Sequence, residues 1–475
     1  MDKDKEFYTE THNEETQQMT PADNGAKTDK KLFVPIYDEE TQQMTLQKNG
    51  SKAIWITAMA EGNFMRKIKS NIHEKIVKFF DPVNQFFIDR DEAIGARKRR
   101  QLLKNMKVIP NRIVFGTFQN CYTCNCKYVA DEILRRGLDY ELIFLVNADV
   151  FYHKEKYSIP EGVKLVLRGS LASYFALGTA KFWVDNALNC IWKEIPKKPE
   201  QIYIDTWHGS LGIKRLGGEK RWIKLAQHSA DFIDYFLTDS VFEEGVFHQS
   251  FWPEVEQLKF GHPRNDILFD REKMKNLREK VYQFYKIESH VKTVLYAPTF
   301  RDNKSDVSAI KIDCVKLKET LEAKFGGEWR VIVKAHMHNR HNSVLRHMFA
   351  NRDAIIDASD YIDMQELIAA ADVGITDYSS WIFDFIMKGA PAFIYARDIE
   401  QYLNSRGFFY PLTQTPFSIA ENDETLASNI MNFDSESYAK ALKEFLDEKG
   451  CYEDGHAAER TVDFICRLSA GEVGK

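Results

Sequence analysis

Five clusters of polar residues each come directly after a short apolar run that reads as a buried strand. The clusters are 205–215, 261–266, 297–302, 334–339 and 376–380. In an open parallel sheet, functional side chains gather at the carboxyl ends of the strands. We therefore expect these clusters to supply the residues of one site.

The first cluster delivers His208 into a turn that contains Gly209 and Gly212 and is followed by Lys214 and Arg215. A histidine beside cations suits a general base that faces an anionic substrate. A single His-Gly pair is also common in ordinary turns, so this cluster alone leaves both interpretations open.

The second and fifth clusters contain groups that bind phosphate elsewhere in proteins. Arg264 follows a Gly-His-Pro turn, where a guanidinium can hold a phosphate with two parallel hydrogen bonds, although Gly-x-Pro is also ordinary turn chemistry. Ser379 and Ser380 precede a predicted helix over 381–387, where hydroxyls and backbone N–H groups favour an anion. Serine is equally a preferred helix N-cap.

The third and fourth clusters follow strands of the second half of the chain. Thr299 offers a hydroxyl after a strand, and Lys334 precedes the histidines His336 and His338. Paired histidines suggest zinc, but these two lie two residues apart in a predicted turn, without a nearby Asp, Glu or Cys. We therefore predict no zinc site here.

The seven cysteines are an odd number without regular spacing, and no secretory signal is recognisable at the N-terminus. This pattern predicts reduced thiols and a cytoplasmic protein. Cys121, Cys124 and Cys126 are close enough to suggest a metal or redox cluster. No fourth ligand is near them, so we predict no metal there.

Two successive series of strands alternate with helical patterns, which predicts an α/β protein with two doubly wound parallel sheets. The first series is 112–118, 140–147, 163–168, 181–185, 201–206 and 235–238. The second series is 293–297, 329–334, 354–356, 373–376 and 392–395. The boundary is predicted at 265–290, and the last helices at 423–470.

The N-terminal residues have a different character. Residues 1–50 are polar and contain a repeat, Glu-Glu-Thr-Gln-Gln-Met-Thr, which predicts a tail or small docking module. Residues 51–107 combine apolar residues at helical spacing with many Lys and Arg. This pattern predicts an amphipathic helical segment on an anionic membrane surface or, equally, a helix packed on the main body.

Charge and hydropathy exclude several classes of protein. A net charge of -5 does not favour nucleic-acid binding. No apolar run approaches the roughly 18 residues of a spanning helix, so any contact with a membrane is predicted to be peripheral, on the inner face.

The order of the motifs resembles the CDP-glycerol glycerophosphotransferase family, the teichoic acid primases and polymerases. That family shows Trp-His-Gly-Thr, Gly-x-Pro-Arg-Asn-Asp, Ala-Pro-Thr-Trp-Arg-Asp, Lys-x-His, and Thr-Asp-Tyr-Ser-Ser followed by Phe-Asp. This chain has close versions of all five, over about 112–412. It departs from the pattern at Ser210, where the family more often has Thr, and at Met337, which stands in place of Pro.

The resemblance implies two Rossmann-like domains that face each other in the GT-B arrangement, an acceptor domain at 108–264 and a CDP-donor domain with the terminal helices at 290–475. It implies catalytic roles for His208, as general base, and for His336. Donor and phosphate binding would fall to Gly209, Ser210, Leu211, Gly212, Arg264, Pro298, Thr299, Lys334, Ala335, Ser379, Ser380 and Asp384. The resemblance implies no firm cofactor, although a divalent cation such as Mg²⁺ would suit the reaction.

The implied reaction moves glycerol phosphate from CDP-glycerol to a hydroxyl of a lipid-linked or polymeric cell-envelope glycan and releases CMP. CDP-ribitol or another CDP-alditol stays open as the donor. Two alternatives are a GT-B glycosyltransferase that uses a nucleotide sugar and a non-catalytic, membrane-docked scaffold.

Overall fold

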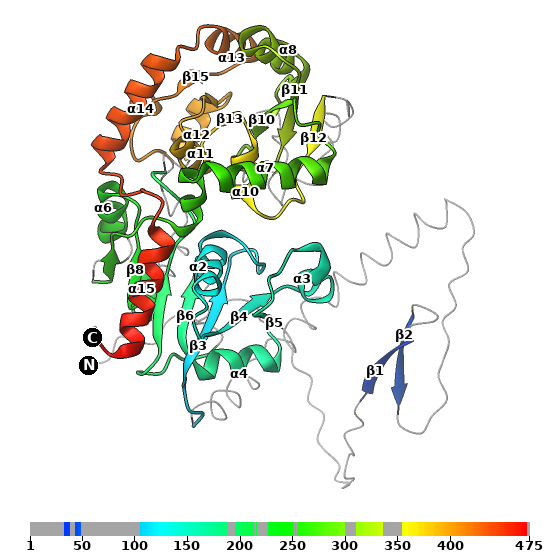
Figure 1. Cartoon of the computed structure of the whole chain (residues 1–475), viewed down its shortest axis with the longest axis vertical. Helices are drawn as coiled ribbons and strands as arrows, with labels where there is room; N and C mark the ends of the chain where they lie inside the picture. The colour runs from blue at the N-terminus through cyan, green and yellow to red at the C-terminus, as the bar shows by residue number, and fades with distance from the viewer. Residues whose placement is uncertain are drawn as a thin grey trace, which may run out of the picture. The chain divides into compact units, whose positions relative to one another are not determined.

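Figure 1 shows the chain as a computed structural model. The structure describes residues 33–38, 43–48, 105–187, 195–212, 215, 227–250, 252, 254–299, 310–335, 354–405 and 407–472. The chain divides into two compact units, Met1–Phe87 and Ile88–Lys475.

The first unit contains an antiparallel pair of strands, β1 (Phe33–Asp38) and β2 (Gln43–Lys48). Residues 1–50 were predicted to form a polar tail or a small docking module, and neither strand was among the predicted strands. The run Phe-Val-Pro-Ile-Tyr in β1 is rich in β-branched and aromatic residues, which favour extended backbone. Of the predicted amphipathic segment at 51–107, residues 51–104 lie outside the described residues.

The second unit contains two parallel sheets, drawn in cyan to green and in green to orange in Figure 1. The first sheet has the strand order β5-β4-β3-β6-β7-β8-β9. Its strands are β3 (Ile109–Gly116), β4 (Glu141–Val146), β5 (Val163–Leu167), β6 (Ala180–Asp185), β7 (Ile202–Asp205), β8 (Tyr235–Leu237) and β9 (Glu256–Leu258). The helices of this region are α2 (Cys124–Arg135), α3 (Ala148–Tyr152), η1 (Lys154–Lys156), α4 (Leu171–Thr179) and α6 (Val241–Ser250).

The second sheet has the order β12-β11-β10-β13-β14-β15. Its strands are β10 (Lys292–Tyr296), β11 (Trp329–Val333), β12 (Ile355–Asp357), β13 (Val373–Thr376), β14 (Ala392–Tyr395) and β15 (Ser418–Ala420). In both sheets the first strand in sequence lies at the centre and the chain reverses direction beside it, which is the doubly wound arrangement. The predicted fold class is confirmed, and in these two sheets the strands not predicted are the three-residue edge strands β9 and β15.

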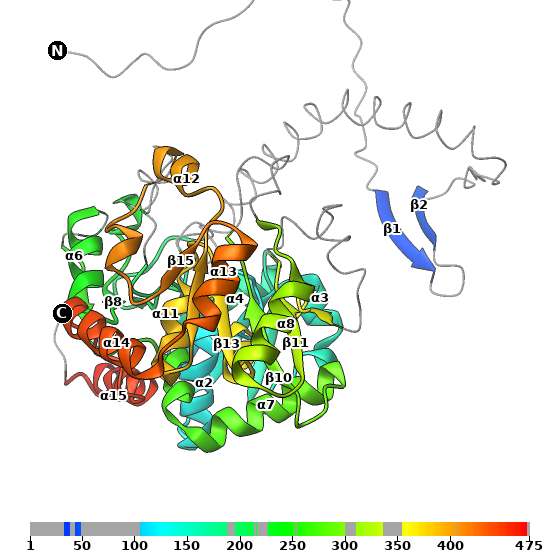
Figure 2. The same ribbon diagram turned by 90° about the horizontal axis from the view of Figure 1, so that it is seen from above.

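Helices cover the second sheet and join it to the first. They are η3 (Pro263–Phe269), α7 (Arg271–Tyr285), α8 (Cys314–Phe325), α10 (Met364–Ala370), α11 (Trp381–Phe385), η6 (Ile386–Lys388), α12 (Ile399–Ser405), η7 (Leu412–Gln414), α13 (Asp423–Met431), α14 (Ser435–Lys449) and α15 (Ala457–Ala470). Figure 2 shows α7, α8 and α13 around the strands of the second sheet. The predicted boundary at 265–290 falls on η3 and α7.

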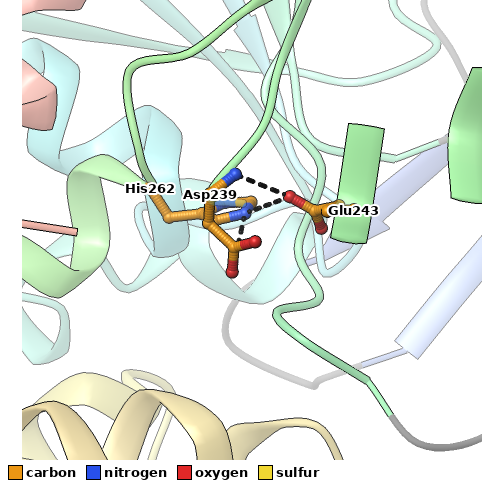
Figure 3. A group of neighbouring side chains, drawn as sticks. All are labelled: Asp239, Glu243 and His262. Atoms are coloured by element: carbon orange, nitrogen blue, oxygen red, sulfur yellow. Dashed lines mark hydrogen bonds and ion pairs between the residues drawn. The ribbon is translucent and has the colours of Figure 1, made fainter. Parts of the chain in front are cut away.

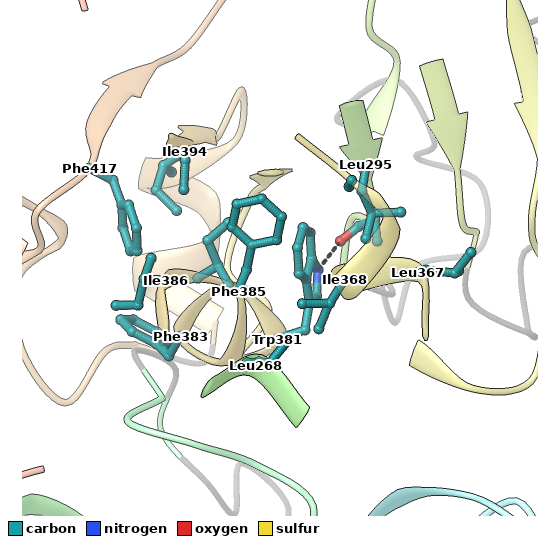
Figure 4. Packing of buried hydrophobic residues seen from close by; sticks show 14 of the residues in the cluster. Leu268, Leu295, Leu367, Ile368, Trp381, Phe383, Phe385, Ile386, Ile394 and Phe417 are labelled. Carbon is teal, nitrogen blue, oxygen red and sulfur yellow. Dashed lines mark hydrogen bonds between the residues drawn. The ribbon is translucent and has the colours of Figure 1, made fainter. Parts of the chain in front are cut away.

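Both sheets are buried on both faces, as the uninterrupted apolar strands predicted. Ile113 and Phe115 of β3 pack in one cluster, and Val114 between them packs in the cluster on the opposite face. In the second sheet, Leu295 belongs to a cluster around α11 that Figure 4 shows from close by. In that cluster the Trp381 indole donates a hydrogen bond to the carbonyl of residue 297, which fixes the start of α11 against the end of β10.

The last helix returns to the first sheet. Val462 and Ile465 of α15 are fully buried in the same cluster as β3 and β4, and Asp266 accepts hydrogen bonds from the first backbone N–H groups of α15. The predicted assignment of all terminal helices to the second domain is therefore wrong for α15. The reason is its apolar face, which finds its partner on the first sheet (Figure 1).

A largely buried ion pair joins the two domains. Lys127 of α2 lies 2.5 Å from Asp363 and 3.0 Å from Glu366 of α10.

The described helices include none that is long and apolar enough to cross a bilayer.

Candidate functional site

The turn after β7 carries the predicted general base on a strained backbone. Trp207 has a left-handed φ of 54°, which costs a non-glycine residue about 1–3 kcal/mol. Asp205 accepts a hydrogen bond from the Trp207 N–H at 2.7 Å, and Asn125 of α2 donates to the carbonyls of Thr206 and Trp207 at 2.8 and 3.0 Å. These buried hydrogen bonds hold the turn in a conformation that it would not adopt by itself.

His208 is half-buried, and its ring is fixed by a hydrogen bond and by stacking. Its Nδ1 lies 2.5 Å from the carbonyl oxygen of Asn186, and a carbonyl only accepts, so Nδ1 carries the proton. The ring stacks on Phe118 at 4.9 Å and contacts Trp207 at 4.6 Å between centroids. This tautomer puts the lone pair on Nε2, as a neutral general base requires.

The three residues after His208 are each held by a side chain from elsewhere in the fold. The carbonyl of Gly209 accepts a hydrogen bond from Arg264 at 2.6 Å, and the Ser210 hydroxyl donates to Asp239 at 2.5 Å. The N–H of Leu211 also points to Asp239, at 3.4 Å, and its carbonyl accepts from the Tyr410 hydroxyl of the second domain. The turn is thus tied to both domains.

Arg264 lies at the junction of three predicted motifs. Its guanidinium forms two hydrogen bonds to Asp384 of α11, at 2.9 and 3.0 Å, and a third to the Gly209 carbonyl. Burial by itself would lower the pKa of Arg264, but the Asp384 carboxylate outweighs burial and raises it. The sequence predicted that Arg264 and Asp384 bind the donor phosphate; in the structure they are buried and their charges face each other.

The second domain brings four of the predicted residues to its switch point, between β10 and β13. The N–H of Thr299, just after Pro298, donates to Asp377 at 2.7 Å, which places it beside the segment that leads to Ser379 and Ser380. Ser380 stands at the N-cap of α11 without a side-chain capping hydrogen bond. Capping therefore does not account for this serine.

Lys334 and Ala335 lie at the end of β11. The Lys334 ammonium donates to the carbonyl of Tyr361, and the Ala335 N–H to the Ser359 hydroxyl at 3.2 Å. The predicted His336 follows directly in sequence but, like His338 and Lys214, lies outside the described residues.

A cavity of about 120 Å³ lies between the two domains and joins the predicted groups. Its walls are the turn residues Trp207, His208, Gly209, Ser210, Leu211 and Gly212, the α6 residues Phe242, Glu243, Val246 and Phe247, and Ser380 and Phe409 of the second domain. Arg215, the cation predicted beside His208, reaches across to the carbonyl of Phe408 at 3.0 Å. The predicted base and one predicted phosphate-binding serine therefore face the same space.

Within the described residues, one group of acidic and histidine side chains is spaced for a shared cation: Asp239, Glu243 and His262 (Figure 3). His262 Nδ1 faces two donors, the amide of Asn125 at 3.2 Å and the guanidinium of Arg264 at 3.5 Å, so Nδ1 accepts. Nε2 then carries the proton and donates to Glu243 at 3.0 Å. A protonated Nε2 is not a metal ligand, so this donor set does not fit Mg²⁺ or zinc.

Ionisation in this cluster follows from burial. Burial and Arg264 lower the pKa of His262 to about 4, in agreement with a neutral ring. Burial and the neighbouring Glu243 raise the pKa of Asp239 to about 7, and burial raises that of Glu243 to about 7.

Asn186, Phe118 and Asp239 were not among the predicted site residues. Asn186 and Asp239 each follow a predicted strand, β6 and β8, so their position at the end of a strand was a signal for both. Phe118 carried no signal, because its role depends on stacking across the fold. The cysteines give no metal set in the described residues; Cys126, for instance, donates its S–H to the carbonyl of Gly116 at 3.3 Å.

The chain is similar to teichoic acid polymerases in sequence and in fold. The teichoic acid poly(glycerol phosphate) polymerase of Staphylococcus epidermidis is 28% identical over 384 residues, which cover 76% of this chain but 51% of the relative, about half its length. The polymerase of the same name from Bacillus spizizenii is 27% identical over 371 residues, 74% of this chain and 91% of the relative.

A solved structure shares the fold. The wall teichoic acid polymerase TagF is 26% identical and superposes with a TM-score of 0.69, over 83% of this chain and 99% of that chain. A family model described as CDP-Glycerol:Poly(glycerophosphate) glycerophosphotransferase matches residues 97–467. The resemblance predicted from five motifs is thereby confirmed, and the chain belongs to the CDP-glycerol:poly(glycerophosphate) glycerophosphotransferase family.

Proposed function

We propose that this protein transfers glycerol phosphate, or a similar polyol phosphate, from a CDP-linked donor to a hydroxyl of a cell-envelope polymer or lipid-linked acceptor. One observation carries the proposal: His208, with its lone pair on Nε2, and Ser380 line the same interdomain cavity. A base on one wall and a hydroxyl on the other suit a phosphoryl transfer between groups bound to the two domains, because that reaction depends mainly on positioning and electrostatics.

The proposed step begins with the acceptor hydroxyl, which gives its proton to Nε2 of His208. The acceptor oxygen bonds to the phosphorus that carries glycerol, and the bond from that phosphorus to the bridging pyrophosphate oxygen breaks. The electron pair leaves with CMP, and the product is a phosphodiester. His208, with Nδ1 donating to Asn186, becomes an imidazolium whose position the stacked rings preserve.

Charge on the transferring group and on the leaving CMP has to be neutralised, because phosphoryl transfer depends mainly on positioning and electrostatics. We assign this to the hydroxyls of Ser379, Ser380 and Thr299 and to Lys334 with the predicted His336, while Pro298 shapes the same strand end. In this proposal Arg264 and Asp384 do not contact the substrate. Their ion pair holds Gly209 and α11 at a fixed spacing. A divalent cation stays a proposal without assigned ligands.

The test is CMP release from CDP-glycerol by the purified full chain, with a polyol-phosphate or lipid-linked acceptor. His208→Gln should lower the turnover about 10²–10⁴-fold, the usual contribution of a general base, with donor binding retained in a thermal-shift titration. His153→Gln, at an exposed position, is the matched control. No CMP from any CDP-alditol, or full turnover by His208→Gln, would refute the proposal.

A panel of donors separates this reaction from its alternatives. CDP-glycerol, CDP-ribitol and a nucleotide sugar are supplied in turn, and the products CMP and nucleoside diphosphate are measured. A glycosyltransferase releases the nucleoside diphosphate from the sugar donor, whereas a non-catalytic scaffold releases neither. Release of CMP from only one alditol donor identifies the polyol.

We also propose that the protein works at the inner face of the cell membrane. The support is the basic, amphipathic sequence of residues 51–107 and the lipid-linked acceptor proposed above. Deletion of residues 51–104 should release the protein from phosphatidylglycerol vesicles in a sedimentation assay. Equal binding by the shortened chain would contradict this part.

A further inference from the structure

The side chain of Asp239 is fully buried next to the residues that line the cavity, and neither the proposed reaction nor the sequence motifs account for it. We infer that Asp239 is a positioning residue for His208, because it holds the 207–212 turn from behind while Glu243 and His262 hold Asp239. This inference rests on the proposed function, and it concerns how the base is aligned.

Asp239 contacts the turn at two successive residues. Its Oδ2 accepts the Ser210 hydroxyl at 2.5 Å and faces the Leu211 N–H at 3.4 Å. Asp239 is fully buried, and it is not among the residues that line the cavity, so it acts through Ser210 and does not touch the substrate. Ser210 is two residues from His208, on a turn that Trp207 already strains.

Asp239 is itself fixed from two other sides. Its N–H donates to Glu243 at 2.8 Å, and its Oδ1 accepts the Ser240 hydroxyl at 2.7 Å. His262 donates from Nε2 to the same Glu243 oxygen at 3.0 Å (Figure 3). Its other nitrogen accepts from Asn125, which also binds the strained carbonyl of Trp207. The cluster and the strained peptide therefore belong to one hydrogen-bonded network.

The arrangement also has a consequence for pH. Two donors converge on Oδ2 of Asp239, so the ionised carboxylate suits the turn, and a proton on that oxygen would displace Ser210 or Leu211. The charged and titratable groups that face Asp239, Glu243 and His262 are Arg264, Asp384, Tyr410, Cys451, Tyr452 and Glu453. Burial, together with the excess of carboxyl groups over the one guanidinium, raises the pKa of Asp239 and Glu243 to about 7, so the cluster takes up protons near neutral pH. Below that range the turn should loosen and turnover should fall.

The experiment is a double-mutant cycle on CMP release with Asp239→Asn, Ser210→Ala and the double variant, in the full chain. Each single change should lower kcat about tenfold or more, since a misplacement of about 1 Å costs up to 10²-fold. KM for the donor should be unchanged for Asp239→Asn. The double variant should be no worse than the poorer single one, because both changes remove the same contact. Ser210→Thr, which keeps the hydroxyl, should retain more activity than Ser210→Ala.

A pH profile separates alignment from a general loss of structure. The acidic limb of kcat in the wild type should shift or flatten in Asp239→Asn, and it should be unaltered in Asp231→Asn, an exposed control. Additive effects in the cycle, or wild-type kcat and pH profile in Asp239→Asn, would overturn the inference. If Asp239→Asn does not fold, an unchanged kcat in Ser210→Ala overturns it instead. A wild type that releases no CMP refutes the proposed function, which is a different result.

Discussion

The two walls of the interdomain cavity are built in different ways. On the first domain, the backbone of the turn around His208 is held by buried side chains at nearly every step, from Asp205 and Asn125 to Asp239 and Arg264. On the second domain, Ser380 begins α11 without a side-chain capping hydrogen bond, and its carbonyl accepts a hydrogen bond from the N–H of Phe383 in the first turn of the helix. One wall is fixed in advance, and the other presents hydroxyls that a ligand can engage.

The difference fits the two tasks that we propose for these walls, a general base on the first domain and phosphate binding on the second. A general base contributes only when its lone pair is aligned with the proton it removes, so its support must be rigid. Groups that bind a flexible pyrophosphate gain most when their hydrogen-bonding capacity is kept for the ligand. Arg264 is where the two walls meet, because it binds Asp384 of α11 and the carbonyl of Gly209.

Replacement of Arg264, which connects the two walls, should have the largest effect on stability and turnover. Arg264→Met leaves Asp384 buried without its cation, which should cost about 3–5 kcal/mol of folding free energy and most of the turnover. Chemical denaturation and CMP release measure the two losses. The double variant Arg264→Met with Asp384→Leu removes both charges, so it should recover stability but not activity.

If the double variant recovered turnover as well, the spacing of the two walls would not depend on this ion pair. If instead Arg264→Met bound donor far more weakly while its stability was preserved, Arg264 would contact the phosphate as first predicted from the sequence. The two outcomes distinguish a positioning role from direct binding.

Distortion of the fixed wall alone should have the next largest effect. A Cβ on Gly209 would lie 2.6 Å from Nε1 of the Trp207 indole, so in Gly209→Ala the ring that contacts His208 must move. Turnover should fall about 10²-fold, the cost of a small misplacement at a reacting group. Steady-state CMP release measures it.

Gly245→Ala is the matched control for that change. Gly245 lies within α6, and a Cβ there meets nothing within 4 Å, so alanine should stabilise the helix by up to about 1 kcal/mol without altering turnover. Equal turnover in Gly209→Ala and Gly245→Ala would show that the wall tolerates more movement than its hydrogen bonds suggest.

The sequence predicted the sheets well and their supporting contacts poorly, and the two walls show why. Buried parallel strands such as β3 and β13 are continuous apolar runs, a local pattern that a sequence displays directly. The contact between Asp239 and Ser210 joins residues 29 apart, and that between Arg264 and Asp384 joins residues 120 apart. Such pairs depend on how distant segments of the chain pack, and the type of a residue does not reveal its partner. For the same reason, the carboxylate partner of Arg264, which is Asp384, was not foreseen when both residues were predicted to bind the donor phosphate.

The adjustable wall should respond to mutation in a different way from the fixed one. Ser380→Ala removes a hydroxyl that caps nothing, so stability should change by less than about 0.5 kcal/mol. KM for the donor should rise about tenfold, as expected for one lost hydrogen bond to a charged group. Denaturation and initial rates over a range of donor concentrations measure both. A loss of stability near 1 kcal/mol would indicate that the serine caps the helix after all.

The smallest expected effect is a pH dependence of stability that comes from Asp239 and Glu243, the buried carboxyl groups that support the first-domain wall. The pKa values of Asp239 and Glu243 are raised from 3.8 and 4.5 to about 7 by burial, so between about pH 4 and 7 the folded protein binds more protons than the unfolded chain. Their contribution to stability is therefore largest at low pH and is lost as pH rises toward 7. For one group this amounts to about 1 kcal/mol between pH 6 and 7. Denaturation at these two pH values should show a smaller decrease with rising pH in Asp239→Asn than in the wild type. Equal decreases would mean that Asp239 keeps one charge state between pH 6 and 7, and the acidic limb of turnover would then have to come from another group.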